Sequence, residues 1–221
     1  PDRFLVDGVN MVVQPRRVTA LIGPSVSGKS LTARCCMGVV DVVPGLARGE
    51  LRYPADDPDR DWYEGIREGG AAAQARLLES TRHLRGHYFT YSPQAASSAL
   101  NPGRTIGRQL ELAIQRRTEM PSDVGLEIGS ILQDVGLKPS VASALPSSLS
   151  GGMAQRAALA IAVAPQPKLV IADEPETGLD PVLRRTVVEL LVDVCKGHGA
   201  GLLLISHHED TVDRIADDVV R

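Results

Sequence analysis

A short glycine-rich segment near the start of the chain has the residue types and the spacing that bind phosphate groups. Residues 23–30, GPSVSGKS, match the pattern G-x-x-x-x-G-K-[ST] at every defined position. In loops of this kind the backbone N–H groups surround the phosphates, the lysine lies beside the outer ones, and the final hydroxyl binds Mg²⁺. The predicted nucleotide-binding residues are Gly23, Pro24, Ser25, Val26, Ser27, Gly28, Lys29, Ser30 and Leu31.

Val26 departs from the usual composition of this loop, which most often has a third glycine at that place. If the backbone there has a positive φ, valine is strained, because a β-branched side chain tolerates that conformation poorly. We therefore expect Val26 to lower the affinity of the loop for a nucleotide.

Two acidic residues follow an apolar stretch in KLVIADEP, residues 168–175. The stretch predicts a buried strand whose carboxyl end meets the ligand crevice of an α/β sheet. Asp173 is then placed to hold Mg²⁺ together with Ser30, and Glu174 is placed to polarise an attacking water molecule. The segment predicts hydrolysis of the bound nucleotide.

A second anion-binding feature is present in LSGGMAQR, residues 149–156. Ser150, Gly151 and Gly152 stand just before a run of helix-forming residues. Free backbone N–H groups and the positive end of the helix dipole would favour an anion there. One domain thus carries two predicted phosphate-binding elements.

Five segments in this order resemble those of the ATP-binding subunits of ABC transporters: GPSVSGKS, LSGGMAQR, VIADEP, TGLD and ISH. The resemblance covers nearly the whole chain. It implies an α/β fold, namely a P-loop NTPase core with an inserted α-helical subdomain, and it implies ATP and Mg²⁺ as cofactors. It also implies a second ABC ATPase subunit, identical or different, because in this family the LSGG segment of one subunit closes on the ATP held by the other.

The same resemblance assigns further residues one at a time. Gln94, in YSPQ, corresponds to a glutamine that reaches Mg²⁺ and the water, and His207 to a histidine that contacts the γ-phosphate. Both join Glu174 as expected catalytic residues. Asp180, in TGLD, corresponds to an aspartate that meets the opposite subunit. Glu176 stands where a small hydroxyl residue is usual, so we expect that contact to be altered.

Composition excludes several other classes of protein. The net charge of −3 gives no electrostatic attraction for nucleic acid, so no nucleic-acid partner is expected. The cysteines, Cys35, Cys36 and Cys195, are three in number and lack metal-ligand spacing, which favours a reduced protein. No apolar run approaches the 18 residues of a membrane span. Because aromatic residues make up only 3% of the chain, we expect an aliphatic core.

Apolar runs and helix-forming segments alternate along the chain, which favours an α/β fold. Predicted strands occupy residues 17–22, 87–91, 168–172 and 201–206, and a further one begins near Asp217. Predicted helices occupy residues 29–38, 71–85, 105–118, 122–136, 150–163, 181–196 and 209–216. Residues 54–70 are rich in Asp, Pro and Gly and predict an exposed loop. Ser122 is the predicted N-cap of its helix, and His208 is expected at the surface.

By the resemblance, residues 1–94 and 150–221 form the ATP-binding core, and residues 95–149 form a helical subdomain that docks a membrane permease. We expect both ends of the chain to be truncated, because strand patterns stand almost directly at each end.

The segment SSALNPGRTIGRQL, residues 97–110, resembles the ATPases of the dipeptide, oligopeptide and nickel importers. The expected function is ATP hydrolysis that drives uptake of peptides or nickel through a separate permease. The protein would then lie at the cytoplasmic face of the cell membrane as a peripheral subunit, with an extracytoplasmic solute-binding protein as an indirect partner.

Two alternatives remain open at this point. Some relatives of the peptide-importer branch serve soluble, non-transport assemblies such as phosphonate-cleaving complexes. Alternatively, Val26 and Glu176 mark a degenerate site that binds ATP without hydrolysing it, beside a competent partner subunit.

Overall fold

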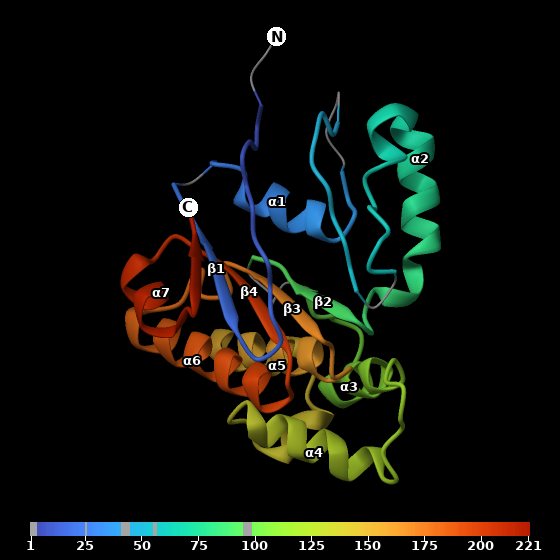
Figure 1. Ribbon diagram of the computed structural model, residues 1–221. Coiled ribbons are helices and arrows are strands. Elements are labelled where there is room, and N and C mark those ends of the chain that lie inside the picture. The colour runs from blue at the N-terminus through green and yellow to red at the C-terminus, as the bar shows by residue number, and fades with distance from the viewer. Residues whose placement is uncertain (1–3, 25, 41–44, 55–56, 95–98) are drawn as a thin grey trace.

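Five parallel strands form the centre of the molecule, in the order β2-β3-β4-β1-β5 (Figure 1). The computed structural model describes residues 4–24, 26–40, 45–54, 57–94 and 99–221. The strands are β1 (Val18–Ile22), β2 (Phe89–Ser92), β3 (Leu169–Asp173), β4 (Gly201–Ser206) and β5 (Asp218–Val220). The predicted α/β class and all five predicted strands are confirmed, with shifts of one or two residues at their ends.

The helices are α1 (Lys29–Cys36), α2 (Ile66–Ser80), α3 (Ile106–Ile114), α4 (Val124–Asp134), α5 (Gly151–Val163), α6 (Pro181–Gly197) and α7 (Glu209–Ile215). Each corresponds to a predicted helix, although α2 begins five residues earlier than expected. Short 3₁₀ turns lie at residues 82–84, 139–143 and 146–148. The N-cap of α4 is Asp123, whose side chain accepts a hydrogen bond from the N–H of Leu126, so the prediction of Ser122 was wrong. None of the helices in the described part of the chain has the length and apolarity to cross a bilayer.

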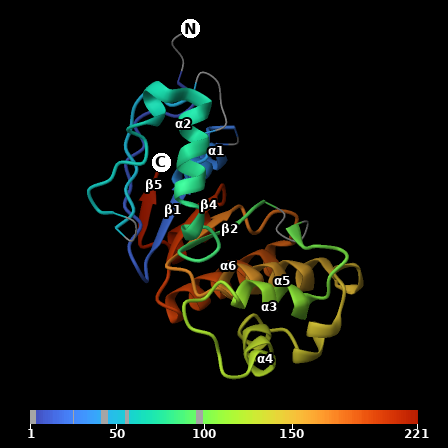
Figure 2. The same ribbon diagram turned by 90° about the vertical axis from the view of Figure 1, so that its right-hand side faces the viewer.

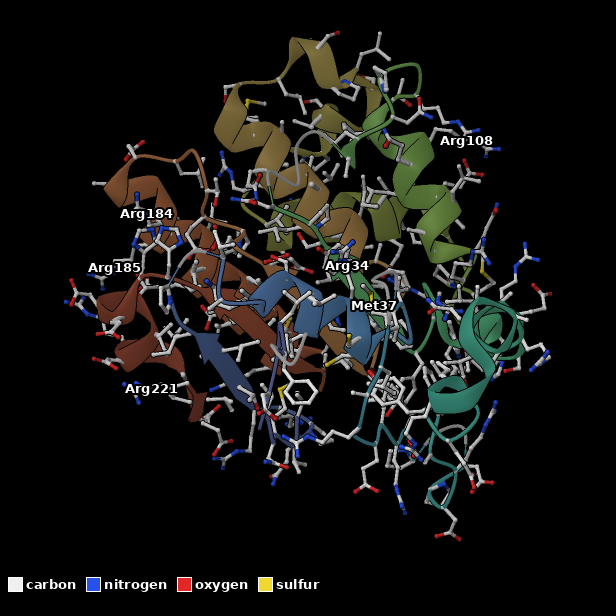
Figure 3. All side chains as sticks on the ribbon, turned by 90° about the horizontal axis from the view of Figure 1, so that it is seen from above. Arg34, Met37, Arg108, Arg184, Arg185 and Arg221 are labelled. Carbon is white, nitrogen blue, oxygen red and sulfur yellow. The ribbon has the colours of Figure 1, made fainter. Side chains whose placement is uncertain are left out.

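Alternate side chains of the buried strands face two separate cores. On β3, Val170 and Ala172 pack against α5 and α6, whereas Leu169 and Ile171 pack in a cluster that contains Ala33 of α1. Figures 1 and 2 show α1 and α2 on one side of the sheet and α5 and α6 on the other. Seen from above in Figure 3, α1 crosses the sheet with Arg34 and Met37 near its carboxyl end.

Helices α3, α4 and α5 surround a third core, which lies away from the sheet (Figure 2). The apolar face of α3 supplies Ile106, Leu110 and Ile114, all without exposed surface. Thr105 caps α3 by accepting a hydrogen bond from the N–H of Arg108. Since α5 contributes to this core and to the one beneath the sheet, it connects the helical part of the molecule with the strands.

The core on the α1 side of the sheet contains aromatic residues among a majority of aliphatic ones, so the expectation of an aliphatic interior holds only in part. All aromatic residues of the chain except Phe4 lie in or against this cluster. The hydroxyls of Tyr53 and Tyr63 donate hydrogen bonds to the carbonyl oxygens of Cys36 and Cys35, at 2.6 and 2.7 Å. Tyr53 satisfies the carbonyl group of Cys36 at the end of α1, whereas the carbonyl oxygen of Cys35 also accepts a hydrogen bond from the N–H of Gly38 at 2.8 Å.

The prediction that residues 54–70 form an exposed loop was therefore wrong for its second half. Trp62 and Tyr63 are only 2% and 6% exposed. The acidic composition suggested exposure to solvent, but the carboxylate of Asp61 instead forms hydrogen bonds with the backbone of this segment. Its Oδ1 accepts hydrogen bonds from the N–H groups of Leu51 and Tyr63, at 3.0 and 2.9 Å.

We expect Trp62→Ala to lower the free energy of unfolding by about 3–5 kcal/mol, because it removes a large buried side chain from the aromatic cluster. Urea denaturation would measure the loss. Leu126→Ala is the matched control, since Leu126 is 75% exposed and its truncation is expected to cost less than about 0.5 kcal/mol. Equal effects of the two changes would contradict the packing described for Trp62.

Candidate functional site

The loop between β1 and α1 carries the glycine-rich segment at residues 23–30. The ammonium group of Lys29 donates hydrogen bonds to the carbonyl oxygens of Gly23 and Pro24, at 2.9 and 2.8 Å, so its charge lies inside the loop. Gly28 caps α1 with a φ of 94°. A Cβ atom there would approach the side chain of Val6 to 2.6 Å, so both the conformation and the space require glycine.

Val26 has a φ of 66° and a fully exposed side chain. The positive φ that the sequence suggested is confirmed. A β-branched residue in the left-handed region carries strain, and no packing of the exposed side chain offsets it. Ser25, the preceding residue, lies outside the described residues.

Asp173, the last residue of β3, has the properties of a cation ligand. Tyr91 on the neighbouring strand β2 donates a hydrogen bond to its Oδ2 at 3.1 Å. Its Oδ1 is buried and has no hydrogen-bond partner among the described residues. Burial and the charge of Asp173 raise the pKa of Tyr91, so this hydroxyl remains a donor at neutral pH. A buried carboxylate oxygen without a partner fits a bound Mg²⁺ ion.

Glu174, the next residue, contacts three polar side chains. Gln94 donates a hydrogen bond to its Oε2 at 3.1 Å, and the hydroxyl of Thr177 lies 3.2 Å from the same oxygen. His207 approaches Oε1 with its Nδ1 at 3.2 Å. The φ of Glu174 is 45°, a conformation that turns the chain sharply after the strand. Its carboxylate is therefore held from both of its oxygens.

Parallel strands explain why these residues gather. The carboxyl ends of β1, β3 and β4 lie at one edge of the sheet, so the segments that follow them, with Lys29, Glu174 and His207, share that edge. The N–H of Glu174 also donates to the carbonyl oxygen of Ile205 at 2.9 Å, which ties the end of β3 to the end of β4. Of the predicted residues, Gln94, Glu174 and His207 are in direct contact.

The segment at residues 150–152 lies apart from this group. Ser150 caps α5 by accepting a hydrogen bond from the N–H of Met153 at 3.3 Å. Helices α5 and α1 cover opposite faces of the sheet. Within the described part of the chain, no hydrogen bond joins residues 150–152 to the loop at residues 23–30. Gly151 and Gly152 are the first residues of α5, on the face of the sheet opposite α1.

Asp180 is exposed at the start of α6, where its Oδ1 accepts a hydrogen bond from the N–H of Val182 at 3.0 Å. Its predicted contact with another subunit is not tested by a single chain. His208 lies at the surface with its side chain partly covered. Its ring lies against that of His207, and its Nδ1 is 3.3 Å from the guanidinium group of Arg184. Burial, His207 and Arg184 together lower the pKa of His208.

Sequence reasoning missed several polar residues of the site. Tyr91 contacts Asp173, Thr177 contacts Glu174, and Ser206 forms hydrogen bonds with Glu176 and with the N–H of His208. They lie in the segments YSPQ, TGLD and ISH, but no role was predicted for them. Glu176 was singled out as an unusual residue, yet its complete burial was not expected. The signal that could have found them is their place within or directly beside the quoted motifs.

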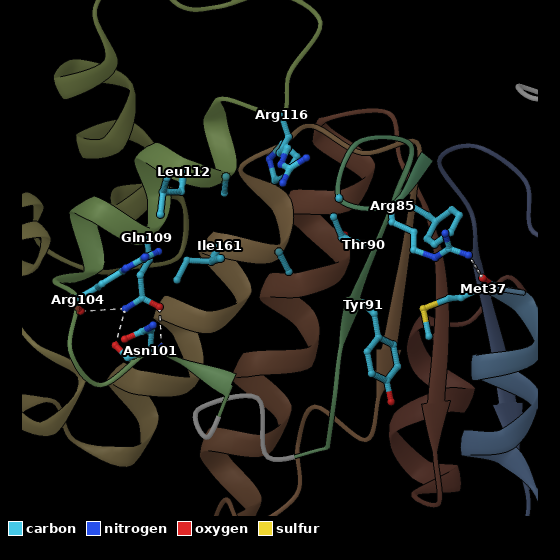
Figure 4. A pocket seen from close by; sticks show the side chains of 15 residues that line it. Met37, Arg85, Thr90, Tyr91, Asn101, Arg104, Gln109, Leu112, Arg116 and Ile161 are labelled. Atoms are coloured by element: carbon cyan, nitrogen blue, oxygen red, sulfur yellow. Dashed lines mark hydrogen bonds between the residues drawn. The ribbon is translucent and has the colours of Figure 1, made fainter. Parts of the chain in front are cut away.

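A groove of about 500 Å³ runs between strand β2 and helices α3 and α5 (Figure 4). One wall carries Met37, Arg85 and Tyr91, and the other carries Leu112 and Ile161. The exposed residues Arg104 and Arg116 also line it. Neither of these two arginines is paired with a carboxylate among the residues that the structure describes.

Comparison with known proteins gives consistent results. The family model described as "ABC transporter" matches residues 6–177. The chain is 32% identical to the oligopeptide transport ATP-binding protein AppD of Bacillus subtilis over 223 residues, covering 97% of this chain and 62% of AppD. It is 33% identical to the nickel import ATP-binding protein NikD of Brucella abortus, covering 98% of this chain and 76% of NikD.

Among solved structures, the ATP-binding subunit of an ABC transporter superposes with a TM-score of 0.68 at 25% identity, covering 98% of this chain and 78% of that chain. The present chain spans about three fifths of the length of AppD.

We expect Val26→Gly to raise the free energy of unfolding by about 1 kcal/mol, because it relieves a positive φ at an exposed position. Tighter binding of ATP is expected as well. Urea denaturation and titration with a fluorescent ATP analogue would measure the two effects. Val26→Ala retains a Cβ atom and should therefore increase the stability and the ATP affinity much less. Unchanged stability and affinity in the glycine variant would disprove the strain.

Proposed function

The chain belongs to the ABC transporter family, and from this premise we propose that it is the ATP-hydrolysing nucleotide-binding subunit of an ABC importer. The observation that carries the proposal is the meeting of Lys29, Glu174 and His207 at one edge of a parallel sheet. A charged phosphate loop, a held carboxylate and a histidine are the groups that phosphoryl transfer to water requires.

ATP would bind with its phosphates against residues 23–31, and the ammonium group of Lys29 would exchange its two carbonyl contacts for phosphate oxygens. Ser30, Gln94 and Asp173 are the proposed ligands of Mg²⁺, and the unpartnered Oδ1 of Asp173 supports this assignment. When bound, Mg²⁺ would supply positive charge that stabilises the phosphates during transfer.

Glu174 is the proposed group that orients the attacking water and accepts its proton. Gln94 and Thr177 occupy one of its oxygens and His207 the other, so the carboxylate has little rotational freedom before substrate binds. Such preorganisation reduces the entropy lost on reaching the transition state. The ring of His207 is 39% exposed, which leaves it accessible to a γ-phosphate as well.

A second ABC ATPase subunit, identical or different, is part of the proposal. The N–H groups at the start of α5 form an anion site with Ser150, Gly151 and Gly152. Because α5 lies across the sheet from α1, these groups would serve the ATP of a partner rather than their own. Asp180, exposed at the start of α6, would then contact the partner subunit.

A membrane permease is the other proposed partner. We assign residues 1–94 and 150–221 to the ATP-binding core and residues 95–149 to a helical subdomain that docks the permease. The groove between them combines apolar walls with the exposed cations Arg104 and Arg116. It would suit a short permease segment with apolar and acidic residues. The subunit would therefore act at the cytoplasmic face of the membrane.

The names of the relatives suggest the class of solute. AppD is described as an oligopeptide transport protein and NikD as a nickel import protein. We propose peptides or nickel as the solute, delivered to the permease by an extracytoplasmic binding protein that this subunit does not touch.

A second function is favoured by one pair of observations. Val26 is strained and Glu176 is buried without full hydrogen bonding. Both fit a subunit that binds ATP but hydrolyses it slowly beside a competent partner subunit.

Purification of the tagged full-length protein from detergent-solubilised membranes tests the main proposal. A co-purifying permease and ATPase partner would support it. Only soluble partners would overturn it in favour of a non-transport assembly.

We expect Glu174→Gln to reduce ATP hydrolysis by the purified assembly at least about 100-fold, because the amide cannot accept the proton of water. ATP binding should persist, and size-exclusion chromatography should show the two ATPase subunits held together by ATP. Glu79→Gln, at an exposed glutamate on α2, is the control with unchanged turnover. Undiminished hydrolysis in the Glu174 variant would refute its role.

We expect the double variant Arg104→Glu/Arg116→Glu to lose the permease during purification, because it reverses the charge of the groove. Arg76→Glu, at an exposed arginine on α2, is the matched control and should retain the permease. Equal recovery of the permease with both variants would remove the groove from the proposed interface.

A further inference from the structure

The carboxyl group of Glu176 is the most deeply buried acid of the molecule's candidate site, with no exposed surface at all. We propose that Glu176 is a positioning residue that holds the segment carrying His207 against Glu174. This inference rests on the proposed ATPase function, because it concerns the geometry of the same site.

The contacts of Glu176 lead directly to the segment after β4. The hydroxyl of Ser206 donates a hydrogen bond to Oε1 of Glu176. The oxygen of that same hydroxyl accepts a hydrogen bond from the N–H of His208 at 3.0 Å. The carboxyl group of Glu176, the hydroxyl of Ser206 and the N–H of His208 thus form a chain of two hydrogen bonds, which we call the relay. It begins two residues after Glu174 and ends one residue after His207. The backbone on either side of His207 is thereby fixed.

The segment that carries Glu176 is itself held from the opposite side. The amide of Gln155, on α5, donates a hydrogen bond to the carbonyl oxygen of Pro175. The N–H of Thr177 donates to the carbonyl oxygen of Glu174 at 3.0 Å, which closes a turn around Glu176. Because these contacts restrain Pro175 and Thr177, the side chain of Glu176 extends from a fixed base toward β4.

The electrostatic surroundings agree with a structural carboxyl group. Burial raises the pKa of Glu176 and the negative charge of Glu174 raises it further, while the hydrogen bond from Ser206 and the nearby His207 oppose the shift. Oε2 of Glu176 is buried and has no hydrogen-bond partner within the part of the chain that the structure describes. An uncharged amide of the same length should therefore be tolerated, since its oxygen can still accept the hydrogen bond from Ser206.

Side-chain length is the decisive property. Glu176 reaches from the segment after β3 to a hydroxyl at the end of β4. A small residue at this place lacks the atoms that make that contact. We therefore expect Glu176→Ala and Ser206→Ala to break the same relay, and Glu176→Gln to preserve it.

The test uses the full-length protein in its purified assembly with four variants: Glu176→Ala, Ser206→Ala, the double variant and Glu176→Gln. Both alanine variants should lower kcat for ATP hydrolysis about tenfold, since a small displacement of reacting groups has effects of that size or larger. KM should change less than about twofold, because the phosphate loop is untouched. The double variant should be no slower than either single one, and the glutamine variant should retain most of the turnover.

Hydrogen exchange gives a second readout that needs no ATP. The amide of His208 should exchange faster in both alanine variants, whereas the glutamine variant should match the wild type. Glu79→Ala, at an exposed glutamate, is the control for both measurements.

Unchanged exchange at His208 in Glu176→Ala would overturn the relay, and unchanged kcat with faster exchange would overturn its role in positioning. Additive losses in the double variant would also overturn it, as would loss of turnover in Glu176→Gln. If Glu176→Ala fails to fold, Ser206→Ala and Glu176→Gln still decide the matter. Absence of ATP hydrolysis in the wild-type assembly would instead count against the proposed function, and the exchange data would still report the relay.

Discussion

The parallel arrangement of the five strands is the constraint on which the rest of the structure depends. A parallel ladder requires every strand to point the same way, so each crossover must travel back along a face of the sheet. Two consequences follow. Helices cover both faces, which creates an aliphatic core on the side of α5 and α6 and a mixed aliphatic and aromatic core on the side of α1. The segments that follow the strands also meet at one edge of the sheet. There, the backbone hydrogen bond from the N–H of Glu174 to the carbonyl oxygen of Ile205 fixes the spacing of two of them.

The site is built from backbone restraint as much as from side chains. Val26 and Glu174 both adopt a positive φ, and both lie directly next to groups assigned to nucleotide chemistry. Strained conformations of this kind persist only where the surrounding structure imposes them. At Glu174 the imposing contacts are visible on each side of the residue. The side chain of Val26 is exposed and makes no packing contact that would stabilise the positive φ. The turn itself and the hydrogen bonds of Lys29 within the loop therefore hold this conformation.

Much of the fold and part of the site could be predicted from the sequence. Features set by neighbouring residues were predictable, whereas features set by contacts between distant residues were not. Local spacing identified the loop before α1, the acids at the end of β3 and the start of α5, because backbone geometry couples neighbouring residues directly. Burial depends on distant residues, so Trp62 could not be recognised as a core residue within its acidic segment. The hydrogen bond between Ser206 and Glu176 joins residues 30 positions apart, and no local pattern encodes it. The assigned roles of the site residues remain predictions.

The pairing of β1 with β4 has a consequence for biosynthesis. Val18 lies opposite Leu202, so the centre of the sheet joins segments made at widely separated times. Until residue 206 has left the ribosome, β1 has neither β4 nor β5 to pair with, and its apolar side chains lack their final neighbours. Chains with such long-range pairing fold slowly and expose strand edges while incomplete. The nascent chain is therefore expected to depend on protection by chaperones until β4 and β5 emerge.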